Sequence, residues 1–186
     1  NRVKNLDGSI LDACTGSGCL AVALKKAAPG NSVYAFDISH GALELAQKNA
    51  ADNQTDVFFF QADLTDLKGF DKAALGAGLK KNSLGLITAN PPYVTEKEKP
   101  GMSDGVLSFE PHQALFVPDR DPLLFYKPLA SVGRMYLKKG GVLFAEINEM
   151  YGHEISLLMR EAGYTDVRIH KDLFEKNRFV EAKWIQ

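Results

Sequence analysis

Short runs of apolar and β-branched residues alternate with segments of helical periodicity along almost the whole chain. Such alternation is typical of a parallel sheet with helices on both faces, because the crossover between parallel strands is usually a helix. We expect strands at residues 9–14, 32–37, 57–61, 84–89, 141–147, 165–170 and 178–185. We expect helices at residues 20–28, 40–51, 122–137 and 151–162. Since only a short link joins the last two strands, they form a hairpin, and the seven-stranded α/β sheet includes one C-terminal antiparallel strand.

The size and charge of the chain limit the classes of protein to which it can belong. Its 186 residues, 45% of them hydrophobic, suffice for one sizeable core, so we expect a single domain over residues 1–186. A net charge of -1 carries no polyanion-binding signature, and no apolar run reaches the roughly 20 residues that cross a bilayer. The two cysteines, Cys14 and Cys19, share one glycine-rich turn and predict a reducing, cytoplasmic compartment. The first residue is Asn1 rather than methionine, which suggests a fragment of a longer protein.

A glycine-rich turn follows the first predicted strand and opens the first predicted helix. Glycines let a backbone approach a ligand closely, and a helix N-terminus offers unpaired N–H groups with partial positive charge. The turn could bind the phosphates of a dinucleotide, since Gly16, Gly18 and Ala21 fit the loose dinucleotide fingerprint. It could equally bind the carboxylate and sulfonium end of S-adenosylmethionine, or be purely structural. The candidate cofactor-binding residues of this turn are Cys14, Thr15, Gly16, Ser17 and Gly18.

Acidic residues end the second and third predicted strands. Asp37 could accept hydrogen bonds from both hydroxyls of a ribose, which both candidate cofactors carry. Asp63 could accept a hydrogen bond from an adenine amino group, with Ile38 and Leu64 covering the faces of the ring. Alternatively, both aspartates simply cap the helices that follow them. Three polar signals at three consecutive strand ends favour a cofactor site at the carboxyl edge of the sheet.

The fourth predicted strand ends in Asn90-Pro91-Pro92-Tyr93, a rigid bend that carries a carboxamide and an aromatic ring. The Asn90 side-chain oxygen and the Pro91 carbonyl could each accept one N–H of a planar –NH2 group, and the locked φ of proline keeps that carbonyl aimed. The Tyr93 ring could stack on the flat acceptor and hold its nitrogen in line with a methyl group. A proline-stiffened strand exit is the structural alternative. As a functional bend, it predicts methyl transfer catalysed by positioning and dipoles, with Asn90, Pro91 and Tyr93 as catalytic residues.

Residues 95–121 interrupt the alternation of strands and helices and contain three prolines. Loops of this length in compact domains are usually functional or disordered. Glu110 in this loop could contact the substrate or be a solvated acid, and Glu146 is expected to make structural hydrogen bonds. The four histidines show no spacing typical of metal ligands, so we expect no metal.

Taken together, the motifs resemble the HemK/PrmC family of protein-glutamine N5-methyltransferases. The resemblance covers nearly all 186 residues and rests on Asp12-x-Cys-Thr-Gly-Ser-Gly18, Asp37, Asp63-Leu64, Asn90-Pro-Pro-Tyr93, Phe109-Glu-Pro-His-Gln-Ala-Leu115, Phe144-Ala-Glu-Ile147 and Lys171-Asp-Leu-Phe-Glu-Lys-Asn-Arg178. Enzymes that methylate exocyclic amino groups of nucleobases share the Asn-Pro-Pro-Tyr run. The block around Glu110 and Pro111 is more particular to the glutamine branch.

The resemblance implies a Rossmann-like, class I S-adenosylmethionine-dependent methyltransferase. Members of the family methylate the glutamine of the Gly-Gly-Gln motif in class I peptide chain release factors and leave S-adenosylhomocysteine as product. By motif match, residues 14–18, Asp37, Leu64 and Asn90 would line the cofactor, while residues 90–93 and Glu110 would bind the glutamine. We expect the chain to be a monomer. The N-terminal helical domain with which the family docks the release factor is expected to be absent from it.

Two positions depart from the family pattern. Many relatives have Gly-Gly-x-Asp-Gly-Leu where this chain has Phe116-Val-Pro-Asp-Arg-Asp-Pro-Leu123. Cys14 stands where many relatives have glycine, and a cysteine fits there if its φ is negative. Arg178 matches a recurrent arginine of the family, but the sequence assigns it no role.

Three alternative functions are compatible with the same motifs. A nucleic-acid methyltransferase acting on adenine N6 or guanine N2 would need a basic surface for phosphates, and the absence of a basic stripe argues against direct nucleic-acid binding. A nicotinamide-dependent oxidoreductase would need a substrate domain or a catalytic acid/base pair, and neither is evident. A binding module without catalysis is the third alternative.

Overall fold

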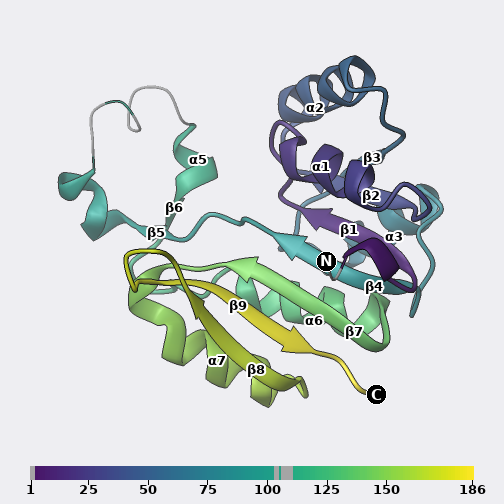
Figure 1. Cartoon of the computed structure of the whole chain (residues 1–186). Helices are drawn as coiled ribbons and strands as arrows, with labels where there is room; N and C mark the ends of the chain where they lie inside the picture. The colour runs from purple at the N-terminus through teal and green to yellow at the C-terminus, as the bar shows by residue number, and fades with distance from the viewer. Residues whose placement is uncertain (1–2, 103–104, 106–110) are drawn as a thin grey trace.

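The computed structural model describes residues 3–102, 105 and 111–186 of the chain. A seven-stranded sheet runs through it in the order β3-β2-β1-β4-β7-β9-β8, with helices on both sides (Figure 1). Its strands are β1 (Ser9–Ala13), β2 (Val33–Asp37), β3 (Phe58–Gln61), β4 (Leu84–Ala89), β7 (Leu137–Glu146), β8 (Thr165–Lys171) and β9 (Asn177–Lys183). The pairs among β3, β2, β1, β4 and β7 are all parallel, and β9 runs antiparallel to both of its neighbours. The predicted α/β class, with a mostly parallel sheet and one antiparallel strand near its C-terminal edge, is confirmed.

The helices form two layers that cover opposite faces of the sheet (Figure 1). α1 (Cys19–Ala27) and α2 (His40–Asp52) contact each other in one layer. In the other layer, α6 (Tyr126–Tyr136) contacts both α3 (Leu67–Gly76) and α7 (Gly152–Glu161). Each layer encloses its own hydrophobic cluster, so the sheet is buried on both sides as a parallel sheet requires.

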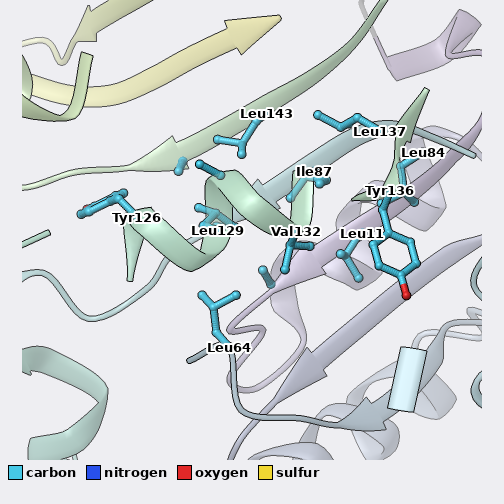
Figure 2. Close-up of a cluster of buried hydrophobic side chains, with 14 of the residues drawn as sticks. Leu11, Leu64, Leu84, Ile87, Tyr126, Leu129, Val132, Tyr136, Leu137 and Leu143 are labelled. Carbon is cyan, nitrogen blue, oxygen red and sulfur yellow. The ribbon is translucent and has the colours of Figure 1, made fainter. Parts of the chain in front are cut away.

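The larger hydrophobic cluster lies between the sheet and the layer of α3, α6 and α7 (Figure 2). Leu11 and Ile87 contribute from the central strands, and Tyr126, Leu129 and Tyr136 contribute from α6; each is at most 1% exposed. Burial of one such side chain stabilises the fold by about 1.5–3 kcal/mol. The cluster therefore fixes the central strands, whose carboxyl ends carry the predicted site.

The helix α3 (Leu67–Gly76) is absent from the predictions. α3 lies between the third and fourth strands, where no element is expected from the sequence. Its signal is short: Phe70 and Ala74, four residues apart, are the buried positions, and the Asp66 side chain accepts a hydrogen bond from the N–H of Gly69 at the start of the helix. With only two buried positions in ten residues, the apolar face is too brief to give a clear helical period.

Two predicted boundaries are also shifted. α6 begins at Tyr126 rather than at residue 122, because the residues before it form turns in which the N–H of Leu124 bonds to the carbonyl of Asp121. β7 begins at Leu137 rather than at residue 141, because an irregularity in its pairing with β4 carries the strand through two lysines that give no strand signal. Short elements without predictions are the 3-10 helices η1 (Val3–Asn5) and η3 (Glu149–Tyr151).

The long loop contains more regular structure than its sequence suggests. β5 (Val94–Thr95) pairs in parallel with β6 (Phe116–Val117), and between them lie the 3-10 helix η2 (Glu96–Gly101) and α5 (His112–Leu115). Each of these elements is too short to show a period, which is why none of them is expected from the sequence. The β5–β6 pair closes the loop at its base, directly after the Asn90–Tyr93 bend.

Candidate active site

The carboxyl ends of β2, β1, β4 and β7 meet at one edge of the sheet. Ala13, the last residue of β1, is aligned with Phe36 of β2 on one side and with Ala89 of β4 on the other. Because the chain leaves β1 toward β2 and returns later as β4, this is the point at which α/β sheets form ligand crevices. The register therefore places Cys14 at the start of the turn directly beside Asn90 at the start of the bend, as the sequence predicts for one shared site.

Two glycines of the turn adopt left-handed backbone conformations, for different reasons. Gly18 has φ +76°, and a Cβ at this position would lie 2.8 Å from the Cβ of Ala46, so the absence of a side chain lets α1 pack closely on α2. Gly16 has φ +55°, and a Cβ there would meet no atom within 4 Å. The space over Gly16 is thus open to a ligand, whereas the space over Gly18 is filled by the fold itself.

Cys14 also adopts the left-handed conformation, with φ +56°, so the condition of a negative φ under which a cysteine fits easily at this position is not met. Residues other than glycine pay roughly 1–2 kcal/mol for this conformation. The side chain packs against the larger hydrophobic cluster, and burial raises the pKa of its thiol, so Cys14 is neutral at physiological pH. A glycine would adopt this backbone without that cost, and packing of the thiol offsets part of it here.

Polar contacts hold the rest of the turn in place. The N–H of Thr15 donates to the carbonyl of Phe36 in β2, over 3.0 Å. The carbonyl of Ser17 accepts a hydrogen bond from the side-chain amide of Asn49 in α2, over 2.9 Å. The turn is therefore tied to the neighbouring strand and to the neighbouring helix, which preorganises it for a ligand.

Asp12 is a site residue that is missing from the candidates predicted from the sequence. It is 2% exposed and accepts hydrogen bonds from the hydroxyl of Thr15, over 2.6 Å, and from that of Thr88 in β4, over 2.7 Å. It thereby connects the turn to the strand that carries the bend. An acid inside the apolar run of residues 9–14 was the signal that could have found it.

Replacing Asp12 by asparagine is expected to change how stability depends on pH. Burial raises the pKa of Asp12 from 3.8 to about 6, although the bonds from Thr15 and Thr88 act in the opposite direction. Because this acid binds its proton more tightly in the folded state, its contribution to stability falls as pH rises from 3.8 to about 6. The shift corresponds to about 3 kcal/mol, so the free energy of unfolding of Asp12→Asn minus that of the parent should grow by about this amount between acidic and neutral pH. Urea titrations across this range check it, and a difference independent of pH would contradict the expectation.

Asp37 is the last residue of β2 and Asp63 lies just after β3, and neither is the N-cap of a helix. Ser39 caps α2 and Asp66 caps α3, so the alternative interpretation of both aspartates as caps is wrong. The carboxylate of Asp37 accepts the N–H of Gly16 over 2.9 Å and that of Ser39 over 3.0 Å. Since a carboxylate has about four acceptor positions, Asp37 retains capacity for ribose hydroxyls. Asp63 accepts two hydrogen bonds from Thr65, each of 2.7 Å.

The two apolar residues predicted to cover an adenine ring differ in exposure. Ile38 is 54% exposed and offers its side chain to a ligand. Leu64 is 3% exposed and packs in the larger hydrophobic cluster, where Figure 2 shows it pointing toward α6. Contact between Leu64 and a cofactor stays a prediction, and the buried side chain limits it to a small surface.

The bend after β4 presents its carboxamide outward and anchors its tyrosine. Asn90 is exposed, and Pro91 beside it is buried. Within the described part of the chain, the Asn90 side chain makes no hydrogen bond, so both of its polar atoms are available to a substrate. Tyr93 donates its hydroxyl to the carboxylate of Glu146 over 2.8 Å. Burial and this hydrogen bond raise the pKa of Tyr93 to about 12, which keeps the hydroxyl a donor.

Glu146 therefore has the structural role expected from the sequence. It receives the Tyr93 hydroxyl, while its backbone carbonyl accepts the hydroxyl of Tyr126 over 2.9 Å. Arg178, which the sequence leaves without a role, donates from its guanidinium to Asp172 over 3.1 Å and also lies close enough to Tyr93 to influence its pKa. Glu110 lies outside the described residues.

The remaining expectations concern ligands and membranes. Over residues 3–102, 105 and 111–186, no cluster of histidine, cysteine, aspartate and glutamate could hold a metal ion. Among the helices of those same residues, none has the length and apolar character needed to cross a bilayer.

The donor and acceptor groups at this edge fit S-adenosylmethionine. The open space over Gly16 admits close approach to the backbone, and α1 directs its N-terminal N–H groups toward the same turn. Asp37 offers acceptor positions for ribose hydroxyls, and the exposed Ile38 offers an apolar surface for a ring. A dinucleotide shares the ribose and the ring, so this donor set alone does not separate the two cofactors.

The similarity to known proteins favours S-adenosylmethionine over a dinucleotide as the cofactor. Residues 1–104 match the family described as MTS: Methyltransferase small domain. The release factor glutamine methyltransferase of Bacteroides thetaiotaomicron is 43% identical over 173 residues, which is 93% of this chain and 59% of that protein. The enzyme of the same name from Flavobacterium psychrophilum is 36% identical over 184 residues, which is 99% of this chain and 60% of that protein. The chain thus spans about 60% of the length of these relatives.

Solved structures support the fold at lower identity. A protein-(glutamine-N5) methyltransferase, release factor-specific, from Alicyclobacillus acidocaldarius is 22% identical with a TM-score of 0.53, and the match covers 100% of this chain and 86% of that one. A methyltransferase from Pyrococcus furiosus is 16% identical with a TM-score of 0.65, covering 97% of this chain and 78% of that one. With the motifs, the sheet order and the family match in agreement, the chain belongs to the methyltransferase small domain family.

Proposed function

We propose that this chain uses S-adenosylmethionine to methylate the side-chain amide nitrogen of the glutamine in the Gly-Gly-Gln motif of class I peptide chain release factors. The observation that carries the proposal is the position of the exposed Asn90 carboxamide beside the glycine-rich turn, on a bend whose tyrosine is anchored. The names and the extent of the matching relatives support the choice of substrate. The proposed place of action is the cytoplasm. A single catalytic domain and a monomeric state stay predictions.

The cofactor site is assigned to the residues of the turn and to the acids after β2 and β3. Residues 14–18 and the N-terminus of α1 would receive the amino acid end of S-adenosylmethionine, Asp37 would accept its ribose hydroxyls, and Asp63 with Ile38 would contact its adenine. When bound, the cofactor supplies an electrophilic methyl group.

The bend would position the nucleophile. The side-chain oxygen of Asn90 and the carbonyl of Pro91 would each accept one N–H of the glutamine amide, which removes rotational freedom from the nitrogen and aligns it for attack. The fixed φ of Pro91 and Pro92 keeps these acceptors aimed, and Tyr93 would stack on the flat amide. Because the amide nitrogen loses its proton only after the new bond forms, no general base is needed beforehand. Catalysis then comes from preorganised dipoles at the carboxyl edge.

The proposal is tested by following the label from S-adenosylmethionine. The chain is incubated with labelled cofactor and, in separate reactions, with a class I release factor, with RNA and with DNA. We expect label in the release factor, located on the glutamine of Gly-Gly-Gln by peptide mass spectrometry, and none when that glutamine is replaced by alanine. Label in nucleic acid alone would overturn the proposal and favour the adenine or guanine alternative.

A further inference from the structure

Asn148 is a buried polar side chain just after β7, and the proposed mechanism does not use it. It is 4% exposed, and every polar atom of its amide is bonded. Its oxygen accepts the N–H of Met150 over 2.9 Å, which holds the turn of η3. Its nitrogen points away from this turn, toward two segments that precede it by about fifty residues.

One hydrogen of the Asn148 amide goes to the Asn90–Tyr93 bend. The nitrogen lies 3.1 Å from the backbone carbonyl of Tyr93. Glu146, two residues earlier in the chain, accepts the hydroxyl of the same tyrosine over 2.8 Å. Tyr93 is therefore held at both ends, its main chain by Asn148 and its ring by Glu146, and both contacts come from the carboxyl end of β7.

The other hydrogen goes to the start of the long loop. The Asn148 nitrogen lies 2.9 Å and 3.2 Å from the two carboxylate oxygens of Glu98 in η2. Glu98 in turn accepts the N–H and the hydroxyl of Thr95, a residue that is 0% exposed. Partial burial by itself raises the pKa of Glu98, but the hydrogen bonds from Thr95 and Asn148 outweigh it and hold the pKa below its ordinary value. Glu98 is thus an ionised acceptor on which the base of the loop is built.

We propose that Asn148 is a positioning residue that fixes Tyr93 and the base of the long loop relative to each other. The inference rests on the proposed function, because Tyr93 matters only if the bend binds the acceptor amide. A carboxamide suits this place because it offers two donors and one acceptor in a plane. A carboxylate of the same shape keeps the acceptor for Met150 but turns both donors into acceptors. It would then face the Tyr93 carbonyl and the Glu98 carboxylate with charge of the wrong sign.

The Asn148→Asp variant tests this directly. We expect its turnover with a release factor to fall about 100-fold, because a catalytic group displaced by about 1 Å costs this much. Its affinity for S-adenosylmethionine should stay within about 3-fold of the parent value, since the hydrogen bonds of the Asn148 side chain go to Tyr93, Glu98 and Met150, which are not assigned to the cofactor. Hydrogen exchange of the Thr95 amide should become at least about 10-fold faster, because the base of the loop opens locally. This last measurement needs neither cofactor nor activity.

A second change provides the rescue. In Asn148→Asp/Glu98→Gln the donor and the acceptor trade places, so the new amide at position 98 donates to the new carboxylate at position 148 while its oxygen still serves Thr95. We expect exchange of the Thr95 amide to return to within about 3-fold of the parent rate. Turnover should recover only in part, because the carbonyl of Tyr93 still faces an acceptor. If Asn148→Asp fails to fold, the double variant decides: Thr95 exchange within about 3-fold of the parent rate supports the positioning role, and exchange at least about 10-fold faster overturns it.

Asn31→Asp is the matched control. The Asn31 amide donates to the carbonyls of Leu6 and Gly8 over 2.8 Å and 2.7 Å, at the opposite end of the sheet. Like Asn148→Asp, the Asn31→Asp variant loses the two N–H donors of one side-chain amide. Turnover and Thr95 exchange should nevertheless stay close to the parent values, even if stability falls. Equal effects in both variants would show a general loss of stability and overturn the positioning role. Unchanged Thr95 exchange in Asn148→Asp would do the same. Absence of methyl transfer by the parent chain would instead reject the proposed function, and the exchange measurement would still decide the role of Asn148.

Discussion

Replacing Asn90 by alanine is expected to lower turnover by about 100- to 1000-fold while leaving the affinity for S-adenosylmethionine within about 3-fold. The exposed carboxamide makes no hydrogen bond within the described chain, so its removal leaves no internal partner unpaired. The substitution removes an acceptor for the glutamine amide, so we expect it to affect substrate binding and turnover rather than the stability of the fold. Single-turnover methylation and calorimetric titration of the cofactor measure the two quantities separately.

Two further variants test whether the effect of Asn90→Ala is specific. Asn90→Asp keeps an oxygen acceptor at nearly the same position, so it should retain more turnover than Asn90→Ala if the oxygen is the group that acts. Asn53→Ala removes a carboxamide at the far end of α2, where it bonds to Lys26, and should leave turnover unchanged. Normal turnover of Asn90→Ala would mean that the amide is bound elsewhere and that the bend is structural.

Gly18→Ala is expected to destabilise the fold by about 2–5 kcal/mol, the sum of about 1–2 for a left-handed backbone and about 1–3 for overpacking. The new methyl group would lie 2.8 Å from the Cβ of Ala46 and 3.1 Å from its Cα, so α1 and α2 must separate. For a chain of this size the loss lowers Tm by roughly 4–20 °C. Thermal unfolding followed by circular dichroism measures it.

Gly16→Ala is the matched comparison for Gly18→Ala. Its φ is similar, but its methyl group would enter open space, so only the backbone cost of about 1–2 kcal/mol applies. Because that space is assigned to the cofactor, the affinity of Gly16→Ala for S-adenosylmethionine should fall by about 10-fold, or about 1.4 kcal/mol. Gly18→Ala should therefore mainly lower stability, whereas Gly16→Ala should mainly lower the affinity for the cofactor. Equal losses of stability would show that the contact with Ala46 does not matter.

The elements of the site, but not all of its contacts, were predictable. The glycine-rich turn, Asp37 and the Asn90–Tyr93 bend each follow a strand, and the rule that parallel strands end at one edge brings them together, as the register confirms. Asp12 and Asn148 have no role predicted from the sequence because their partners are distant along the chain: Thr88 lies 76 residues from Asp12, and Tyr93 lies 55 residues from Asn148. No local pattern encodes such a pairing.

The conformation of Cys14 shows the same limit at one residue. The residue type alone does not reveal its backbone conformation: a cysteine fits most easily with a negative φ, and the chain adopts +56°. Packing of the side chain against the large cluster and the bond from Thr15 to β2 outweigh a local cost of roughly 1–2 kcal/mol.

By itself, the amino-acid sequence determined the succession of the strands of the large sheet, four of the helices that cover it and the chemistry present at each strand end, because these follow from hydrophobic periodicity and from the fixed backbone preferences of glycine and proline. Only the tertiary structure decided which side chains support that chemistry: Glu146 and Asn148 hold Tyr93, and Asp12 joins the turn to β4. The reason is that periodicity reports how a residue relates to its neighbours along the chain, whereas a buried polar group takes the partner that folding brings within hydrogen-bonding distance.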